Sequence, residues 1–337
     1  MKITIGSRGG HYAAKFSIFL IITALITGIP SSYGVGGDDN HPSQNLEIRT
    51  WYDLNAVRDN LDGDHILMND LNSTTPGYTE LASPTANGGE GWQPIGYSTS
   101  VTSCQRSTTF IYGLSGTLDG QGYEICDLFI NRPDETPAGL FAYINEGGII
   151  KNVGVVNVTV IGYNWVGSLV GSKIGGTISN CYSTGNVTGH AAIGGLVGRN
   201  LKGTISNSYS TGSVSAESST GIGGLVGQQH SEGTISNSYS TCSVAGDLRR
   251  PSYIGGLVGE NWHVENVISS FWDTETSGQA TSDGGIGKNT TEMHDITTFS
   301  VVGWNITEVA LNQTNPAYIW NIVNNVTYPF LSWQPVS

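Results

Sequence analysis

The sequence predicts an all-β protein folded as a right-handed parallel β-solenoid of about six rungs, with an N-terminal helical cap and an aromatic-rich C-terminal cap. Composition is the first observation: 47 of the 337 residues are glycine and 12% are charged, against about 7% and about 25% in ordinary domains. Glycine disfavours helices and suits tight turns. Second, a sequence unit recurs every 25–30 residues, and third, aliphatic and asparagine residues keep fixed places within it.

Each unit has two recurring parts. The first part reads IGGLVG, or VGSLVG in its earliest full copy, and the second reads GTISNSYSTG or a close variant. The copies of the first part are Val166–Gly171, Ile193–Gly198, Ile222–Gly227 and Ile254–Gly259, and those of the second are Gly176–Gly185, Gly203–Gly212 and Gly233–Cys242. One such unit is too small to bury an apolar side alone, so the units must stack on one another.

Aligning the units gives three columns of equivalent residues. The first apolar column is Ile125, Ile150, Ile178, Ile205, Ile235 and Val264, and the second is Leu140, Leu169, Leu196, Leu225 and Leu257. A polar column lies two positions after the first: Asp127, Asn152, Asn180, Asn207, Asn237 and Asn266. Stacked rungs place equivalent residues about 4.8 Å apart, so the aliphatic columns are expected to fill a narrow core. The asparagines are expected to satisfy backbone groups at turns.

Both ends of the repeat array need covers, because end rungs expose unpaired strand edges. Thr50 followed by Asp53 predicts a capped helix over residues 51–61, placed over the first rung. After the last unit, six aromatic residues are expected to form a lid on the terminal rung, with a sugar-stacking platform as the alternative. They are Phe299, Trp304, Trp320, Tyr328, Phe330 and Trp333.

The N-terminus has the pattern of a signal peptide. Lys2, Arg8 and Lys15 precede an apolar run over residues 16–29. The sequence Ser32-Tyr33-Gly34 then supplies small residues at the −3 and −1 positions of a cleavage site after Gly34. An uncleaved membrane anchor is the alternative, although such a helix usually needs about 20 apolar residues. We therefore expect a secreted protein, extracellular or on the cell surface, with no transmembrane span in the mature chain.

These signals divide the chain into four predicted segments. They are a signal peptide over residues 1–34, an N-terminal cap and lead-in over 35–104, a solenoid over 105–272 and a C-terminal cap over 273–337.

The repeats resemble the GLUG motif, which is named for its Gly-Leu-any-Gly core. The flanks are similar to that family too, with a lead-in at Met68–Leu71, Gly91–Gly96 and Gly116–Gly120 and a tail at Phe271–Gly278 and Tyr328–Trp333. The family occurs in bacterial and archaeal secreted and surface proteins, including adhesin-like proteins and regions attached to IgA-specific metallopeptidases. The resemblance implies a β-helix-like fold, an extracellular setting and no catalytic residues.

The sequence assigns no catalytic, cofactor-binding or metal-binding residue. Solenoid enzymes that cut polysaccharides use paired carboxylates, and within the repeats only Glu232 and Glu260 come near the same predicted corner. His230 and His263 on adjacent units could share a metal, although scattered loop histidines are commoner. The net charge of −13 disfavours nucleic acid as a partner.

Two functions from different classes remain. The leading one is a non-enzymatic extracellular surface or adhesin-like module, a rigid rod that presents polar loops to glycans, the cell envelope or other surface proteins, with self-association as a further role. The alternative is a carbohydrate-active solenoid: a polysaccharide lyase, a hydrolase or a glycan binder. Its support is an analogy of fold and the exposed aromatics.

The cysteines test the predicted register. Cys181 takes the column of Ser208 and Ser238, and Cys242 falls two rungs further on. Two rungs are about 9–10 Å, whereas a disulfide needs Cα atoms within about 7 Å, so this pair should not form. Cys104 and Cys126 lie about one rung apart, and the sequence leaves open whether they are bonded.

Overall fold

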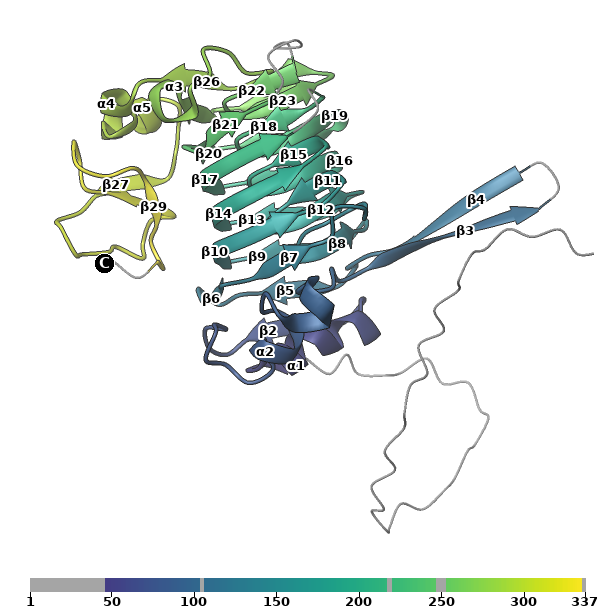
Figure 1. Ribbon diagram of the computed structural model, residues 1–337. Coiled ribbons are helices and arrows are strands. Elements are labelled where there is room, and N and C mark those ends of the chain that lie inside the picture. Colours follow the sequence, from purple (N-terminus) through teal and green to yellow (C-terminus); the bar gives the residue numbers. More distant parts are fainter. Residues whose placement is uncertain (1–45, 104–105, 217–219, 247–252, 335–337) are drawn as a thin grey trace, which may run out of the picture. The chain divides into compact units, whose positions relative to one another are not determined.

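The computed structural model describes residues 46–103, 106–216, 220–246 and 253–334, most of which form a parallel β-solenoid (Figure 1). The predicted signal peptide lies outside the described residues, as does Cys104. No helix among the described residues combines the length and the apolar character that a membrane crossing requires.

Each turn of the solenoid contributes strands to three parallel sheets. The large sheet has 11 strands: β1 (Leu46–Ile48), β2 (Asp64–Leu67), β5 (Thr117–Asp119), β8 (Phe141–Ile144), β9 (Ile149–Lys151), β12 (Val170–Lys173), β13 (Thr177–Ser179), β16 (Val197–Ser206), β19 (Val226–Ser236), β23 (Val258–Asn261) and β24 (Val267–Ile268). The tyrosine sheet has nine: β6 (Glu124–Cys126), β7 (Phe129–Asn131), β10 (Gly154–Ile161), β14 (Tyr182–Gly189), β17 (Tyr209–Ala216), β20 (Tyr239–Ser240), β21 (Ser243–Ala245), β25 (Phe271–Asp273) and β26 (Ile286–Lys288). The short sheet has four: β11 (Asn164–Gly167), β15 (Ala191–Gly194), β18 (Ile222–Gly223) and β22 (Ile254–Gly255).

The strands that begin directly after the five leucines of the second aliphatic column count the turns. They pair in chain order as β8, β12, β16, β19 and β23, all parallel. The solenoid therefore has about five turns, where the sequence predicts about six. A separate antiparallel hairpin, β3 (Tyr97–Ser103) with β4 (Arg106–Tyr112), projects from the solenoid (Figure 1).

The first aliphatic column is confirmed in its middle and wrong at both ends. Ile150, Ile178, Ile205 and Ile235 pair directly from rung to rung and are all fully buried. Leu118 precedes this series, because Ile125 pairs instead with Val155 in the tyrosine sheet. Val267 follows the series, because Val264 lies in a short 3₁₀ helix, η4 (Val264–Asn266), where it is 57% exposed. Because the residues of η4 come first, the last member of this column lies three positions later in the chain than predicted.

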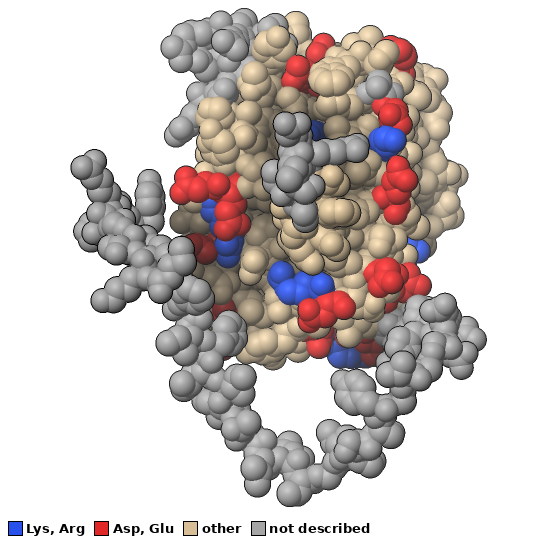
Figure 2. Space-filling model, turned by 90° about the vertical axis from the view of Figure 1, so that its right-hand side faces the viewer, with Lys and Arg blue, Asp and Glu red and all other residues tan. Residues whose placement is uncertain are grey.

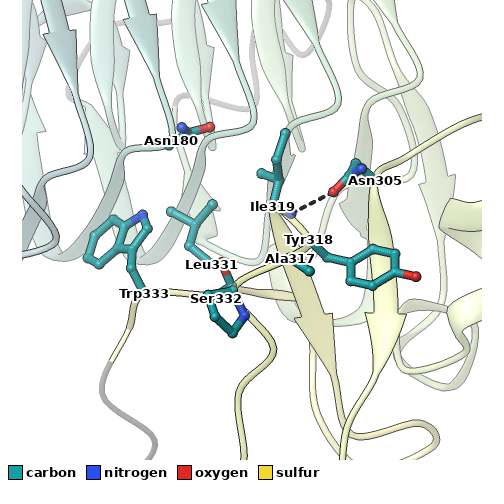
Figure 3. A pocket seen from close by; sticks show the side chains of 9 residues that line it. Asn180, Asn305, Ala317, Tyr318, Ile319, Leu331, Ser332 and Trp333 are labelled. Carbon is teal, nitrogen blue, oxygen red and sulfur yellow. Dashed lines mark hydrogen bonds between the residues drawn. The ribbon is translucent and has the colours of Figure 1, made fainter.

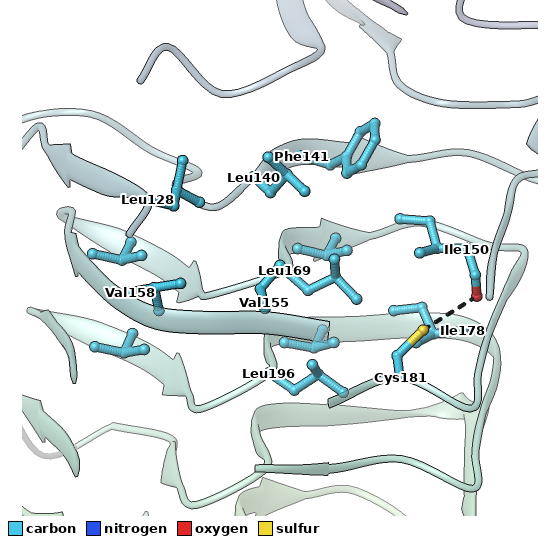
Figure 4. Close-up of a cluster of buried hydrophobic side chains, with 14 of the residues drawn as sticks. Leu128, Leu140, Phe141, Ile150, Val155, Val158, Leu169, Ile178, Cys181 and Leu196 are labelled. Carbon is cyan, nitrogen blue, oxygen red and sulfur yellow. Dashed lines mark hydrogen bonds between the residues drawn. The ribbon is translucent and has the colours of Figure 1, made fainter. Parts of the chain in front are cut away.

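The second aliphatic column is confirmed throughout. All five leucines are fully buried, and the backbone N–H of Leu169, Leu196 and Leu225 each donates to the equivalent leucine carbonyl of the next turn. Figure 4 shows Leu140, Leu169 and Leu196 stacked beside the isoleucine column in the interior. At about 1.5–3 kcal/mol for each buried aliphatic side chain, these columns supply the main drive for folding.

The asparagine column turns the chain between the large sheet and the tyrosine sheet. Asn152, Asn180, Asn207 and Asn237 all have left-handed backbone, with φ between 47° and 53°, a conformation that asparagine tolerates better than most residues. The predicted end members are wrong. Ser269 takes the place of Asn266, and Asp127 pairs through its side chain with Asn157 at another corner.

Close backbone packing explains the glycines of the repeat. A Cβ atom at Gly194 would lie 2.1 Å from the carbonyl oxygen of Val197, and one at Gly198 would lie 2.4 Å from backbone atoms of Trp165 and Val166. No L side chain fits there without moving backbone, so IGGLVG marks a corner where successive rungs touch.

The N-terminal cap begins as predicted and is shorter. Thr50 caps α1 (Trp51–Ala56) in a reciprocal capping box with Asp53, and α1 continues only into a single 3₁₀ turn, η1 (Val57–Asp59). Trp51, Leu54 and Val57 are fully buried against the core. Two further short helical segments, α2 (Tyr78–Leu81) and η2 (Ala86–Gly89), complete this region.

The predicted aromatic lid on the terminal rung is wrong in position. The edge of the last turn is covered by residues 281–288, where β26 adds to β25 and the backbone N–H of Gly256 donates to Thr281. The aromatic residues belong to a later segment that lies beside the tyrosine sheet (Figure 1). This C-terminal segment, residues 289–334, contains α4 (Thr290–Met293), α5 (Ile296–Ser300), β27 (Ile306–Glu308), β28 (Trp320–Ile322) and β29 (Phe330–Leu331), whereas α3 (Thr274–Ser277) precedes residues 281–288.

One interior column is polar, which the sequence alignment does not anticipate. Lys173, Asn200, Gln229 and Asn261 occupy equivalent positions, and the first three are fully buried. Nζ of Lys173 donates to the carbonyl of Lys202, and Nδ2 of Asn200 donates to Oε1 of Gln229 at 2.8 Å. Burial lowers the pKa of Lys173 to about 7.

The cysteine register is confirmed. The backbone N–H of Cys181 donates to Oγ of Ser208 at 3.2 Å, and Ser208 and Ser238 repeat the same bond to the next rung. Cys181 and Cys242 are buried free thiols. Cys126 is also a free thiol in the structure, so no bridge to it is present.

These thiols are expected to be unreactive in the folded protein. Burial raises the pKa of Cys181 to about 12 and that of Cys242 to about 11, and the thiolate is the reactive form. Iodoacetamide at pH 8 should leave both unlabelled, and the same reagent in urea should label both. Peptide mapping that finds Cys181 linked to Cys242 would contradict the observed register.

Candidate functional site

A ladder of tyrosines runs along the outer face of the tyrosine sheet. Tyr182, Tyr209 and Tyr239 pair in register, and their rings stack with centroids 5.0 and 4.8 Å apart. All three are less than 10% exposed, because the C-terminal segment covers them.

The cover combines aromatic packing with hydrogen bonds. The ring centroid of Trp320 lies 6.1 Å from the ring centroid of Tyr209 and 5.8 Å from that of Tyr239. The hydroxyl of Tyr239 donates to the carbonyl of Pro329 at 2.6 Å, and Nε2 of Gln334 donates to the hydroxyl of Tyr209 at 2.7 Å. The C-terminal segment is thereby fixed along several rungs.

A hollow of about 340 Å³ lies between the solenoid corner and this segment (Figure 3). Asn180 contributes from the corner, whereas the other lining residues come from the C-terminal segment. These are Asn305, Pro316, Ala317, Tyr318, Ile319, Leu331, Ser332 and Trp333. A second hollow, of about 290 Å³, shares Trp333 and is lined otherwise by Asp119, Gln121, Gly122 and Asn152.

The polar groups at the corner form a directed chain. Nδ2 of Asn180 donates to Oδ1 of Asn152 at 3.0 Å, Nδ2 of Asn152 donates to Oδ1 of Asp119 at 3.1 Å, and Lys151 forms an ion pair with Asp119 at 3.1 Å. Burial opposes ionisation of Asp119, but the hydrogen bonds from Gln121 and Asn152 and the ion pair with Lys151 together lower its pKa. Its charge is therefore retained and locally neutralised.

Two atoms of the first hollow's lining residues lack a partner within the described chain. Oδ1 of Asn180 and Nε1 of Trp333 are both buried without a hydrogen bond. In Figure 3 the indole nitrogen of Trp333 is turned toward Asn180. One atom is an acceptor and the other a donor.

The acidic and histidine residues weighed from the sequence do not converge. Glu232 pairs in register with Lys202, whereas Glu260 pairs with Gln228 at another position of the sheet. His230 packs on Trp262 and His263 contacts Glu265. Within the described ranges, no three His, Cys, Asp or Glu residues are grouped to hold a metal ion. Figure 2 shows one face on which charged residues occupy small separate groups among uncharged ones.

Neither hollow is predictable from the repeat pattern of the sequence. One signal for them is present in the sequence, because a tyrosine recurs two positions after Asn180, Asn207 and Asn237. Aromatic side chains on the outer face of several successive rungs indicate that another part of the chain packs over them. The residues that supply the cover have no periodicity, so their place beside the ladder could not be aligned.

Comparison with known proteins identifies the repeat. The model of the GLUG motif matches residues 189–215, which run from the end of β14 through β15 and β16 into β17, about one turn of the solenoid. The chain contains a GLUG motif. In structural terms, the GLUG motif is here one rung with its glycine corner and its buried leucine.

Two known proteins are similar to parts of the chain. It is 36% identical over 103 residues, or 31% of the chain, to Halomucin of Haloquadratum walsbyi, where the match covers 1% of that protein. It is 32% identical over 171 residues, or 48% of the chain, to a protein of Evansella cellulosilytica described as a candidate Gly-rich membrane protein, of which 17% is covered. The chain thus spans only a small part of the length of each relative.

A solved structure shares the fold. The crystal structure of a candidate immunoglobulin A1 protease from Bacteroides ovatus matches the present chain over 87% of its length, and the match covers 94% of the crystallised chain, with a TM-score of 0.52 and 18% sequence identity. At this identity the likeness concerns the fold alone.

Proposed function

We propose that the protein is a non-enzymatic module of the extracellular surface, a rigid rod of stacked rungs that presents polar side chains and loops to glycans, the envelope or other surface proteins. The N-terminal signal pattern supports export, and the likeness to Halomucin and to a Gly-rich membrane protein supports a surface setting.

The observation that carries the proposal is how outward polar side chains are used. They pair from one rung to the next: Nη2 of Arg199 donates to Oγ of Ser172, Nε2 of Gln228 donates to Oε2 of Glu260, and Lys202 pairs with Glu232. Such pairs hold rungs together. Glycosidase chemistry needs two carboxylates directed at one bond, and Glu260 and Glu232 are each engaged at separate positions.

Surface labelling tests this proposal. The full chain should be produced in a bacterial host, and intact cells treated with a membrane-impermeant biotin reagent. We expect the protein in the biotinylated or culture-medium fraction, starting near residue 35, while a cytoplasmic control protein stays unlabelled. Recovery only from the lysate, still beginning at Met1, would reject an extracellular role.

A further inference from the structure

We infer that the two hollows that share Trp333 form one binding site for a neutral oligosaccharide. The inference deepens the proposed surface function and rests on it, since it names the class of ligand that the rod binds. Four observations carry it: the unpartnered polar atoms, the direction of the amide chain, the charge balance and the aromatic walls.

The unpartnered atoms require a ligand group that both donates and accepts. The indole N–H of Trp333 can only donate, and Oδ1 of Asn180 can only accept. Leaving both buried and unpaired is costly, and no described residue pairs with either. A hydroxyl group is able both to accept a hydrogen bond from an indole N–H and to donate one to an amide oxygen. Sugars carry such hydroxyls on every ring.

The amide chain explains why the acceptor is available at Asn180. Each step passes hydrogen bonds in one direction, from Asn180 to Asn152 to Asp119. The chain therefore ends with an oxygen at Asn180 that nothing within the described residues occupies. Asn207, one rung further on, has the same backbone conformation but does not line either hollow.

Charge selects against ionic ligands. Among the described residues that line the two hollows, Asp119 is the only carboxylate, lysine or arginine, and Lys151 neutralises it. No lysine or arginine among the described residues lines them, so within this part of the chain a uronate or phosphate would find no counter-charge. A metal ion would find a single, already paired carboxylate.

The walls suit sugar rings. Trp333 lies at the junction of the hollows, and Tyr318, 38% exposed, lines the first of them. Volumes of about 340 and 290 Å³ fall near the lower end of the range for small-molecule sites. Aromatic faces cover the C–H faces of a sugar while a few polar groups fix its orientation.

Calorimetry on the purified full chain tests the site. The probes are three neutral hexasaccharides, cellohexaose, mannohexaose and xylohexaose, with hexagalacturonic acid as the charged comparator. We expect at least one neutral probe to bind. Asn180→Gly keeps the left-handed corner and removes the amide, and Trp333→Phe keeps a ring and removes the N–H. Each should weaken binding about tenfold.

Asn207→Gly is the matched control, because it makes the same change one rung away and should bind like the wild type. Thermal midpoints of all three variants should stay close together, which separates lost binding from lost folding. Absence of binding by every neutral probe at millimolar concentration, equal affinity in all variants, or tighter binding of hexagalacturonic acid would each overturn the inference. Surface labelling of intact cells is independent of this result.

Discussion

Ile205→Asp is expected to destabilise the protein by more than about 4 kcal/mol, because the change places an unpaired charge in a core position with no polar neighbour in its column. Ile205 is fully buried and pairs with Ile178 on one side and Ile235 on the other. Urea unfolding followed by circular dichroism measures the change in the free energy of unfolding.

Ile205→Val is the matched control, with an expected loss of about 1 kcal/mol from one buried methylene. If the aspartate variant does not fold, the comparison becomes the soluble yield of the two variants under the same expression conditions. An aspartate variant as stable as the valine variant would mean that this column does not face the core.

Lys173→Met is expected to stabilise the protein at pH 7. Lys173 is fully buried, with its pKa lowered by burial from 10.5 to about 7. Each unit of pKa difference corresponds to about 1.4 kcal/mol, so the lysine disfavours folding by up to about 4–5 kcal/mol. Methionine has a similar shape and no charge, and part of the gain is offset by the lost hydrogen bond to Lys202.

Because the pKa of Lys173 is lower in the folded than in the unfolded protein, its effect on the free energy of unfolding depends on pH. Above pH 10.5 the amine is neutral in both states and contributes nothing. As the pH falls toward 7, the unfolded chain takes up the proton and the folded chain does not, so stability falls. The advantage of Lys173→Met should therefore grow from pH 10.5 down to pH 7 and then level off. The exposed Lys202→Met serves as control, and an advantage independent of pH would contradict the burial of a neutral amine.

The fold could be predicted from the sequence where the same residue type recurs in the same environment on every rung. Leu169, Leu196 and Leu225 stack as aligned because every rung offers the same buried position, and a GLUG motif spans one such rung. The prediction failed at the ends of the array. Ile125 and Val264 match the column in sequence spacing, but Leu118 and Val267 occupy those places in the structure, Val267 after the inserted η4 turn.

The candidate site could not be predicted because it is not periodic. Asn180 was assigned a structural role in its column, and it has one. Its second role depends on Trp333, which lies 153 positions later in the chain. Which rung the C-terminal segment reaches depends on tertiary packing on Tyr182, Tyr209 and Tyr239. Likewise, Lys173 occupies a position where the alignment has amides, and only the structure reveals that this column faces inward.

The central claim is that this solenoid works by binding and not by catalysis. The most direct test incubates the purified full chain with neutral and acidic polysaccharides and with immunoglobulin A1, and follows reducing ends, unsaturated uronates and peptide fragments. We expect no product from the wild type, and no difference between it and the variants Glu232→Gln and Glu260→Gln. Release of product by the wild type, abolished by replacing one carboxylate with its amide, would show that the solenoid is an enzyme.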